Sequence, residues 1–395
     1  MDKVIIAGAG PVGLVAAAKL VSAGIPVHML EAGADLGTES RASTFHPPTL
    51  DMLDEFGATA PLMAQGLKAP QLQYRLHDGG LIAGFDFTDI SDLTAHPYRV
   101  QSEQFKLTRI LLNGLQSNPS FQIEFGAEVE RVENDGSQAR VHVTSNGRSS
   151  VRTAAWVLGA DGARSNVRRS LDIEFEGFTW PDRFLVLSTP YDFKARIPDL
   201  VSVNYVADPE CWYFLLQIPG LWRVMFPISA EMSDDDALVP AFGQTLLQRI
   251  IPQETFEVTH ATLYRVHQRV AKTFRLGRVA LAGDAAHINN PLGGMGMNGG
   301  IHDAISYAGK LIEVIGGRAP ESLLDAYDRQ RRAVTIEAVQ KQTIQNKTDL
   351  EAKTPEARAE FRERLLKIKG DPEATRAYLQ RVGMIASLRR AAEIA

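Results

Sequence analysis

Short apolar runs, each followed at once by a glycine-rich turn, recur at three places along the chain. The runs cover residues 4–7, 156–158 and 279–282. Continuous apolar runs of this length are typical of parallel strands that are covered on both faces. The pattern therefore predicts an α/β fold in which buried strands lead into tight turns at one edge of a sheet.

The remaining elements follow from periodicity and from turn residues. Helical spacing of apolar positions, with glycine or proline at the ends, predicts helices. Alternating apolar positions between Asn-Gly-type turns predict strands. Helices are expected over 14–23, 47–57, 102–116, 299–315 and 323–345, and strands over 121–158 and 183–228. From residue 346 onward Lys, Arg and Glu are mixed throughout, so we expect a solvated helical tail there.

The first glycine-rich turn fits a phosphate-binding loop. Gly8-Ala9-Gly10-Pro11-Val12-Gly13 lies between an apolar strand and a helix that ends before Gly24. In such a turn the first glycine makes the bend, the second admits a pyrophosphate, and the third lets helix and strand pack closely. Glu31 ends the next predicted strand, 18 residues past Gly13 and near the spacing expected of a carboxylate on a ribose. The alternative is an ordinary glycine turn.

The other two turns each carry an acid at the end of a strand. Asp161 and Gly162 follow residues 156–158, and Asp284 follows Gly283. Asp161 could cap the following helix, or it could face a cofactor together with nearby basic residues. A carboxylate at Asp284 can accept hydrogen bonds from a sugar-alcohol chain. Both interpretations of Asp161 stay open from the residues alone.

Composition narrows the class of protein. The chain has 395 residues, is 45% hydrophobic and 23% charged, and carries a formal net charge of −5, which does not favour nucleic acid as a partner. Cys211 is the only cysteine, so no internal disulfide or multi-thiolate metal site is expected. We expect no membrane span, no secretory signal, no metal, a cytoplasmic location, and a monomer or homodimer.

Taken together, the three motifs resemble those of the group A flavoprotein monooxygenases, the family of para-hydroxybenzoate hydroxylase. That family combines an N-terminal GxGxxG with a middle DG and a late GD, in this order. The resemblance implies a non-covalently held FAD, with Glu31 on the adenosine ribose and Asp284 on the ribityl chain. It also implies that Arg41 and Gln101 approach the FAD, and that Arg164 is a candidate contact for NADH or NADPH.

The glycine-rich segment of residues 291–296, called the late loop below, is expected to lie against the isoalloxazine ring. Pro291, Gly294 and Gly296 offer little side-chain bulk, so backbone N–H groups can approach the ring. A helix starting near Met297 and Asn298 would direct its positive end at N1 and O2 of the flavin, where the reduced ring is anionic.

The implied domains are interleaved. Residues 1–75, 98–180 and 270–330 are assigned to a Rossmann-like FAD-binding domain, residues 76–97 and 181–269 to a β-sheet substrate domain, and residues 331–395 to C-terminal helices. The substrate pocket is expected beneath the strands of the second domain, closed by the loop at Pro291. Candidate lining residues are Tyr205, Trp212, Tyr213, Arg223 and Phe226, although sheet core is the favoured interpretation for any single aromatic there.

The implied activity is hydroxylation of a small activated ring, such as a phenol, aminophenol or hydroxypyridine, by dioxygen through a flavin C4a-hydroperoxide. No catalytic base is nominated. Three alternatives remain: an FAD-dependent reductase or dehydrogenase, a flavin halogenase, and a flavoprotein without catalysis. The halogenase is disfavoured because Tyr213 and Leu215 stand where such enzymes have tryptophans.

Overall fold

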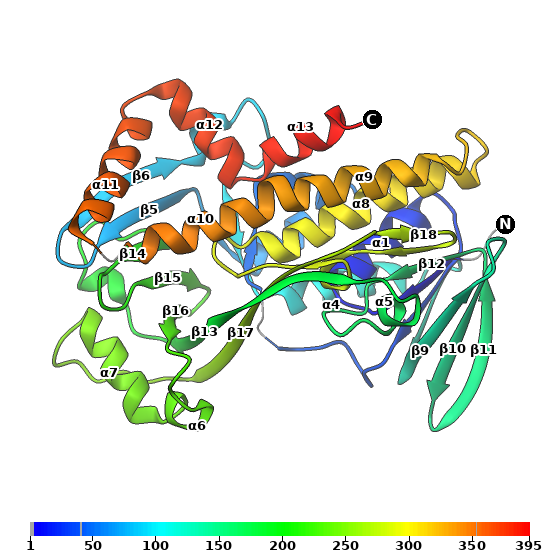
Figure 1. Ribbon diagram of the computed structural model, residues 1–395, viewed down its shortest axis with the longest axis horizontal. Coiled ribbons are helices and arrows are strands. Elements are labelled where there is room, and N and C mark those ends of the chain that lie inside the picture. Colours follow the sequence, from blue (N-terminus) through cyan, green and yellow to red (C-terminus); the bar gives the residue numbers. More distant parts are fainter. Residues whose placement is uncertain (1–3, 40–41, 353) are drawn as a thin grey trace.

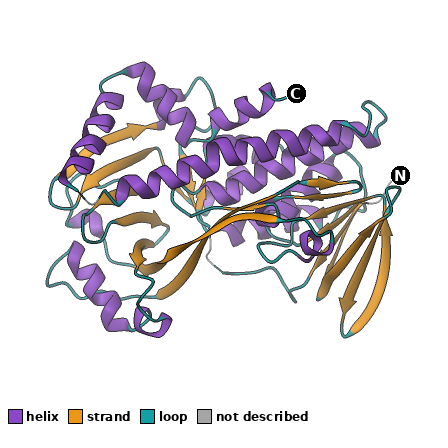
Figure 2. Ribbon diagram, viewed as in Figure 1, coloured by secondary structure: helices purple, strands orange, loops and turns teal. Residues whose placement is uncertain are grey.

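The structure is a computed structural model that describes residues 4–39, 42–352 and 354–395. Two β-sheets lie at opposite ends of the molecule, and the long strands β13 (Phe175–Thr189) and β17 (His260–Ala271) run between them (Figures 1 and 2). Helices pack against the first sheet, and other helices lie on each of the two faces of the second sheet. The expected α/β class with a helical C-terminal segment is confirmed.

In the part of the chain that the structure describes, six strands form the first sheet. Their order across the sheet is β18 (Arg275–Leu276), β19 (Val279–Leu281), β12 (Trp156–Gly159), β1 (Val4–Ala7), β2 (Val27–Glu31) and β8 (Phe121–Phe125). All neighbours pair in parallel except β18 with β19. Every residue of β1 and β12 is buried, which explains why both strands are apolar throughout.

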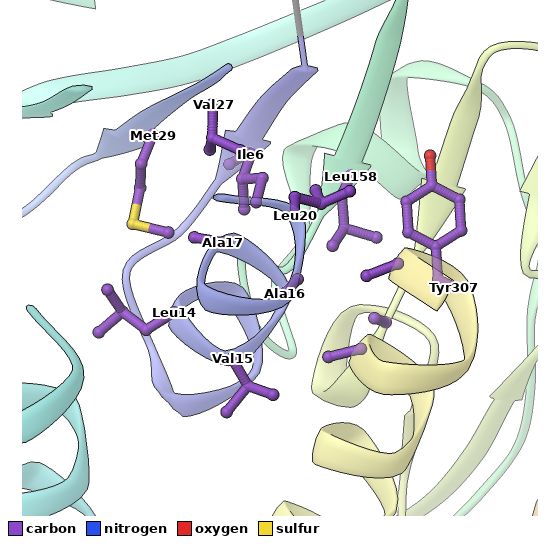
Figure 3. Close-up of a cluster of buried hydrophobic side chains, with 14 of the residues drawn as sticks. Ile6, Leu14, Val15, Ala16, Ala17, Leu20, Val27, Met29, Leu158 and Tyr307 are labelled. Atoms are coloured by element: carbon purple, nitrogen blue, oxygen red, sulfur yellow. The ribbon is translucent and has the colours of Figure 1, made fainter. Parts of the chain in front are cut away.

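Helix α1 (Pro11–Ser22) packs between this sheet and helix α8 (Met295–Ile315). It begins with proline in its first turn, and the chain leaves it through Gly24 in the left-handed conformation, at φ +74°. Figure 3 shows α1 between the strands that carry Ile6 and Met29 and the helix that carries Tyr307. Leu20 is fully buried there, which contributes about 1.5–3 kcal/mol relative to an exposed leucine.

A second sheet supplies two faces of different character. Among the described residues its order is β20 (His287–Ile288), β17, β13, β16 (Leu221–Ile228), β15 (Tyr213–Ile218), β14 (Val203–Ala207), β5 (Gln71–Leu76) and β6 (Gly80–Asp86). One face packs against helix α7 (Pro240–Ile250) and is called the outer face. The opposite face packs against Leu292 of the late loop and is called the inner face.

The C-terminal segment consists of helices that are packed onto this inner face. After α9 (Leu323–Val334) and a π-helical turn (Thr335–Gln340) follow α10 (Lys341–Leu350), α11 (Pro355–Lys369), α12 (Pro372–Val382) and α13 (Ile385–Glu393). The expectation of a solvated tail is wrong, because Phe361 and Leu379 are 2% and 0% exposed, and the hydroxyl of Tyr378 donates to that of Tyr74 at 2.9 Å. Phe361 and Leu365 are spaced i, i+4, so a few apolar residues among many charges suffice to form one buried stripe.

Smaller elements complete the chain. A three-stranded antiparallel sheet and a three-stranded sheet of short strands flank the first sheet. They comprise β9 (Ala127–Asn134), β10 (Ala139–Ser145), β11 (Arg148–Ala154), and β3 (Thr44–Phe45), β7 (Arg99–Gln101), β4 (Leu67–Ala69). The remaining helices are α2 (Pro47–Asp54), α3 (Thr59–Ala64), α4 (Gln104–Leu115), α5 (Asn166–Ser170), α6 (Asp234–Ala237), and the 3₁₀ turns Phe87–Ile90, Phe193–Ala195 and Gly283–Ala285. None of the described helices has the length and apolar character needed to cross a bilayer.

Candidate flavin and substrate site

The glycine-rich turns meet at one edge of the first sheet. β1, β12 and β19 run in parallel, with Ala7 opposite Gly159 and Gly159 opposite Leu281. The turns that follow these strands therefore emerge side by side, at the edge where β2 also ends in Glu31. Ligands of open α/β sheets bind at this carboxyl edge.

Close packing explains why several turn positions are glycine. A Cβ atom on Gly8 would lie 2.4 Å from the carbonyl oxygen of Ala160, and the residue adopts φ +100°. A Cβ on Gly13 would lie 2.1 Å from the carbonyl oxygen of Gly8, and one on Gly283 would lie 2.8 Å from Cγ2 of Val12. The first turn thus touches both the middle and the late turn, so the three motifs form one surface.

Gly10 differs from its neighbours because its missing side chain leaves open space. A Cβ on Gly10 would meet nothing within 4 Å, although the residue immediately precedes helix α1. The first amides of a helix have no acceptor within the helix and favour an anion. The carboxylate of Glu31 lies at the same loop, where it accepts the N–H of Ala9 at 2.7 Å and that of Gly33 at 2.8 Å.

The middle turn carries a cap and a buried arginine. Asp161 accepts the N–H of Val167 at 3.0 Å, so the capping interpretation of this residue has a contact to support it. Burial raises the pKa of Asp161, and its hydrogen bonds offset part of this effect. Arg168 donates to the carbonyl of Ala285 at 2.8 Å and so ties the middle turn to the late one. Arg164 lies on the surface beside Gly162.

A buried charge network holds the late turn from behind. Asp303 of α8 accepts the N–H of Gly283 at 3.1 Å and pairs with His287 and with Arg331 of α9, both at 2.7 Å. Burial alone would raise the pKa of Asp303, but His287 and Arg331 hold it below its ordinary value. Asp284 itself is exposed at the sheet edge. Sequence reasoning missed Asp303 and Arg331, although an acid in the apolar stripe of a helix is a usable signal.

The late loop is fixed by the segment that contains Thr44 and His46. The side chain of Asn298 accepts the N–H of His46 at 2.9 Å and donates to the carbonyl of Thr44 at 2.8 Å. His46 Nε2 donates to the carbonyl of Gly293 at 2.8 Å. Burial, together with the charge of Arg99, lowers the pKa of His46 well below its ordinary value, so the ring is neutral near pH 7.

Helix α8 begins directly after this loop. Gly294 adopts φ +66° at the N-cap, and α8 starts at Met295, two residues earlier than Met297. Asn298 is fully buried, Met297 is 9% exposed, Gly296 is partly buried, and Pro291 lies on the surface. The backbone amides at the N-terminus of α8 are therefore available to a ligand. Asn298 does not face that ligand but holds the segment of Thr44 and His46 by hydrogen bonds.

Gln101 has an unused donor at this place. Its Oε1 accepts the hydroxyl of Thr44 at 2.7 Å, whereas its Nε2 is buried without a partner. A buried amide N–H without an acceptor costs free energy unless a ligand supplies one. Arg41 lies outside the described residues.

These observations fit a long dinucleotide along the sheet edge. Space at Gly10, the amides at the starts of α1 and α8, and the spare donor of Gln101 all suit FAD, which has a pyrophosphate at its centre and hydrogen-bonding groups on its ring system. Glu31 at the end of β2 and Asp284 after β19 lie on opposite sides of β1 and β12 along that edge.

The predicted substrate residues divide between the two faces of the second sheet. Tyr205 and Trp212 belong to the inner face, in the same core as Leu292 of the late loop. Tyr213 and Phe226 belong to the outer face, in the core that contains residues of α7. Strand alternation separates them, because neighbouring residues point to opposite sides. Only the inner-face residues adjoin the late loop.

Arg223 lies on the inner side of β16 and reaches the segment that contains Ser43. It is 6% exposed, and its Nη1 donates to the hydroxyl of Ser43 at 3.0 Å. Burial lowers the pKa of Arg223, and the neighbouring Tyr264 offsets part of this shift. A guanidinium remains charged in proteins. The structure thus places a buried cation between the second sheet and the segment that fixes the late loop.

This fold and site suit a protein that binds FAD, and comparisons with known proteins identify the class as FAD-dependent monooxygenases. The model of the FAD binding domain family matches residues 1–342. The chain therefore belongs to this family, within the group A flavoprotein aromatic hydroxylases, and FAD is its cofactor.

Relatives match along almost the whole chain. Para-nitrophenol 4-monooxygenase of Pseudomonas sp. (strain WBC-3) is 36% identical over 362 residues, which are 91% of this chain and 89% of the relative. The 6-hydroxy-3-succinoylpyridine 3-monooxygenase of Pseudomonas putida (strain DSM 28022 / S16) is 32% identical, covering 90% of each chain. The crystal structure of p-nitrophenol 4-monooxygenase from Pseudomonas putida DLL-E4 matches with a TM-score of 0.91, 32% identity and 99% of each chain.

Proposed function

We propose that this protein uses FAD, NADH or NADPH, and dioxygen to insert one oxygen atom into a single-ring phenol or hydroxypyridine. The reacting atom is a substituted ring carbon opposite the ring hydroxyl. In para-nitrophenol, position 4 is the carbon that carries the nitro group, and the first relative is named for oxygenation there. In 6-hydroxy-3-succinoylpyridine, positions 3 and 6 are opposite each other, and the second relative is named for oxygenation at position 3.

The proposed reaction balances. The phenol HO–C₆H₄–X, dioxygen, NAD(P)H and a proton give benzoquinone, HX, water and NAD(P)⁺. One oxygen atom bonds to the carbon that bore X, the C–X bond breaks, and the second oxygen atom leaves as water. The nicotinamide supplies two electrons, and X departs with its bonding pair as the conjugate base of HX.

The observation that carries the proposal is the buried Arg223. An electrophilic oxygen attacks a ring carbon more readily when the ring hydroxyl is ionised, because the negative charge spreads to the carbon opposite. A cation within hydrogen-bonding distance lowers the pKa of a bound phenol and so favours the phenolate. Arg223 is 6% exposed and lies beside Ser43, so it can supply this charge where water is excluded.

The cofactor is held by the residues of the sheet edge. Gly8, Gly10, Pro11, Val12 and Gly13 would approach the pyrophosphate, Glu31 the ribose, and Asp284 the ribityl chain. Gln101, the loop from Pro291 to Gly296 and the start of α8 would hold the flavin ring. Bound FAD, once reduced by the nicotinamide, supplies the chemistry that activates dioxygen.

The test is a set of matched phenols. The FAD-loaded protein is mixed with NADH or NADPH and 4-nitrophenol, 4-chlorophenol or 4-nitroanisole, which lacks the free hydroxyl. Nicotinamide oxidation is followed by absorbance, and released nitrite or chloride is quantified. We expect stimulated oxidation and release of X from at least one free phenol and none from the anisole. Equal oxidation with the anisole, or consumption of the phenols without release of X, would contradict the proposal.

Replacing Arg223 tests its role separately. Arg223→Met is expected to lower kcat/KM by about 10- to 200-fold, since hydrogen bonds to charged groups are worth about 1.5–3 kcal/mol. The optimum pH should rise, because the bound phenol then ionises less readily. Arg223→Lys restores a charge and should recover part of the activity at unchanged FAD content. An unaltered pH profile in Arg223→Met would exclude phenolate stabilisation by this residue.

A further inference from the structure

A cavity lies on the outer face of the second sheet, the face that does not pack against Leu292 of the late loop. It has a volume of about 270 Å³ and is bounded by β14, β15, the end of α7 and the loop that contains Leu200. Its apolar walls include Val206, Leu215, Ile250 and Ile251. Val206 and Leu215 point away from the inner face, because their strand neighbours Tyr205 and Phe214 belong to that face.

A buried cation opens onto this cavity. Arg75 of β5 is 8% exposed, and its guanidinium donates to the side-chain oxygen of Gln73 at 3.0 Å and to the carbonyl of Pro198 at 3.2 Å. Among the described residues, no carboxylate oxygen lies within 4.0 Å of it. Burial lowers the pKa of Arg75, and the charge of Asp199 offsets part of this shift. Asp199 is exposed and forms no ion pair with Arg75, so an anion in the cavity would supply a closer counter-charge.

Two further polar groups stand beside Arg75. The hydroxyl of Tyr213 and Nδ1 of His77 are 3.0 Å apart, and both residues line the cavity. Burial raises the pKa of Tyr213, which keeps its hydroxyl protonated and able to donate. Arg196 also lines the cavity, where it is exposed and pairs with Glu254 at 3.1 Å. The apolar side chains of Val206, Leu215, Ile250 and Ile251 form another part of the wall.

We infer that this cavity binds a small aromatic carboxylate, with the carboxylate on Arg75 and Tyr213 and the ring against Val206 and Leu215. Cavities for drug-sized ligands measure about 300–1,000 Å³, so 270 Å³ suits a single ring. Inorganic anions would use Arg75 but leave the aliphatic wall uncovered. The inference does not rest on the proposed function, and its test requires no turnover.

The probe is 4-fluorobenzoate, and its binding to the FAD-loaded protein is followed by ¹⁹F NMR. The absorbance of the flavin is recorded in the same titration, because a ligand beside the flavin ring changes that spectrum and one on the outer face does not. We expect saturable binding with an unchanged flavin spectrum. Inorganic phosphate should need at least a tenfold higher concentration to displace the probe. Displacement at equal concentration would show an unselective anion site and overturn the inference.

Three variants locate the site. Arg75→Gln removes the charge, and Leu200→Trp fills the cavity without altering any charge. Both should weaken binding of the probe at least tenfold, while Arg362→Gln, an exposed arginine of α11, should leave it unchanged. Photolabelling with 4-azidobenzoate should then mark peptides that contain residues 75–80, 196–215 or 250–251. Wild-type affinity in both Arg75→Gln and Leu200→Trp, or labels elsewhere in the chain, would refute the site. Melting temperature and FAD content identify a variant that has failed to fold.

Discussion

At the scale of single residues, the glycines of the first turn have separable roles. Gly8 and Gly13 are required by the protein itself, since a Cβ on either would overlap backbone atoms of the turns. At Gly10, by contrast, a side chain would contact no other protein atom, because the space beside this residue is open. We therefore assign Gly10 to the cofactor, and substitution can separate this role from folding.

Gly10→Ala is expected to change the free energy of unfolding of the apoprotein by no more than about 1 kcal/mol, the cost of alanine at a helix N-cap. The affinity for FAD should fall at least tenfold, because the new methyl group would meet the pyrophosphate. Titration of the apoprotein with FAD, followed by flavin fluorescence, measures this. Gly309→Ala, in α8 with open space around it, is the matched control and should keep full affinity. Full FAD affinity in Gly10→Ala would place the pyrophosphate elsewhere.

A buried histidine makes the stability depend on pH. His302 is 1% exposed and bonded to Thr49, and burial lowers its pKa to about 3, with a smaller effect of Arg331. Below its unfolded pKa of about 6.5, the unfolded chain binds a proton that the folded protein does not. Stability therefore rises with pH through this range and is lost as pH falls.

Between pH 7.5 and pH 5.5 this one histidine should remove about 1.4 kcal/mol of stability. Urea unfolding at both pH values measures the difference, and His302→Gln should reduce it by that amount. His260→Gln, at an exposed position, should leave the difference as in the wild type. If His302→Gln retains the full pH dependence, the imidazole is charged in the folded protein.

At the scale of elements, the C-terminal helices belong to the core of the second sheet. The ring of Phe361 packs edge-on against Tyr74 at 5.7 Å between centroids, and Arg99 donates to the carbonyl of Val382 at 3.1 Å. Met384 shares a buried cluster with Met295, the first residue of α8. The segment thus also supports the helix that starts at the flavin loop.

Phe361→Ala should lower the free energy of unfolding by about 3–5 kcal/mol, the usual cost of deleting a buried phenylalanine. Phe178→Ala, which removes a ring that is 44% exposed, should cost about 1 kcal/mol or less. Chemical denaturation of both variants provides the comparison. A loss below 1 kcal/mol for Phe361→Ala would mean that the helices are solvated after all.

Local patterns predicted the elements of the first sheet well, because each signal lies within a few residues. The strand at Val4–Ala7, its helix and the acid at Glu31 are where the sequence places them. The sequence could not show which side of β15 faces the late loop, since alternation fixes two faces but not their neighbours. The sequence also did not predict the contact of Arg168 with Ala285 or the pairing of Asp303 with Arg331, because the partners lie far apart along the chain. The domain boundaries and the roles of the site residues stay predictions.

At the scale of the whole molecule, the chain passes back and forth between its two sheets. It enters the second sheet at β5 and β6, returns to the first for β8 and β12, crosses again through β13 to β17, and comes back at β18 and β19. The flavin edge of one sheet and the inner face of the other are therefore joined by several crossings. This arrangement places Arg223 of one sheet beside Ser43, near the turns of the other.

The measurement that tests the account most directly uses ¹⁸O₂. We incubate the FAD-loaded protein under labelled dioxygen with NAD(P)H and a phenol that stimulates nicotinamide oxidation. The molecular mass of the product is then measured by mass spectrometry. Incorporation of one ¹⁸O atom per product molecule is the predicted result. A product that forms without any label would identify a dehydrogenase or reductase and contradict the assignment of a monooxygenase.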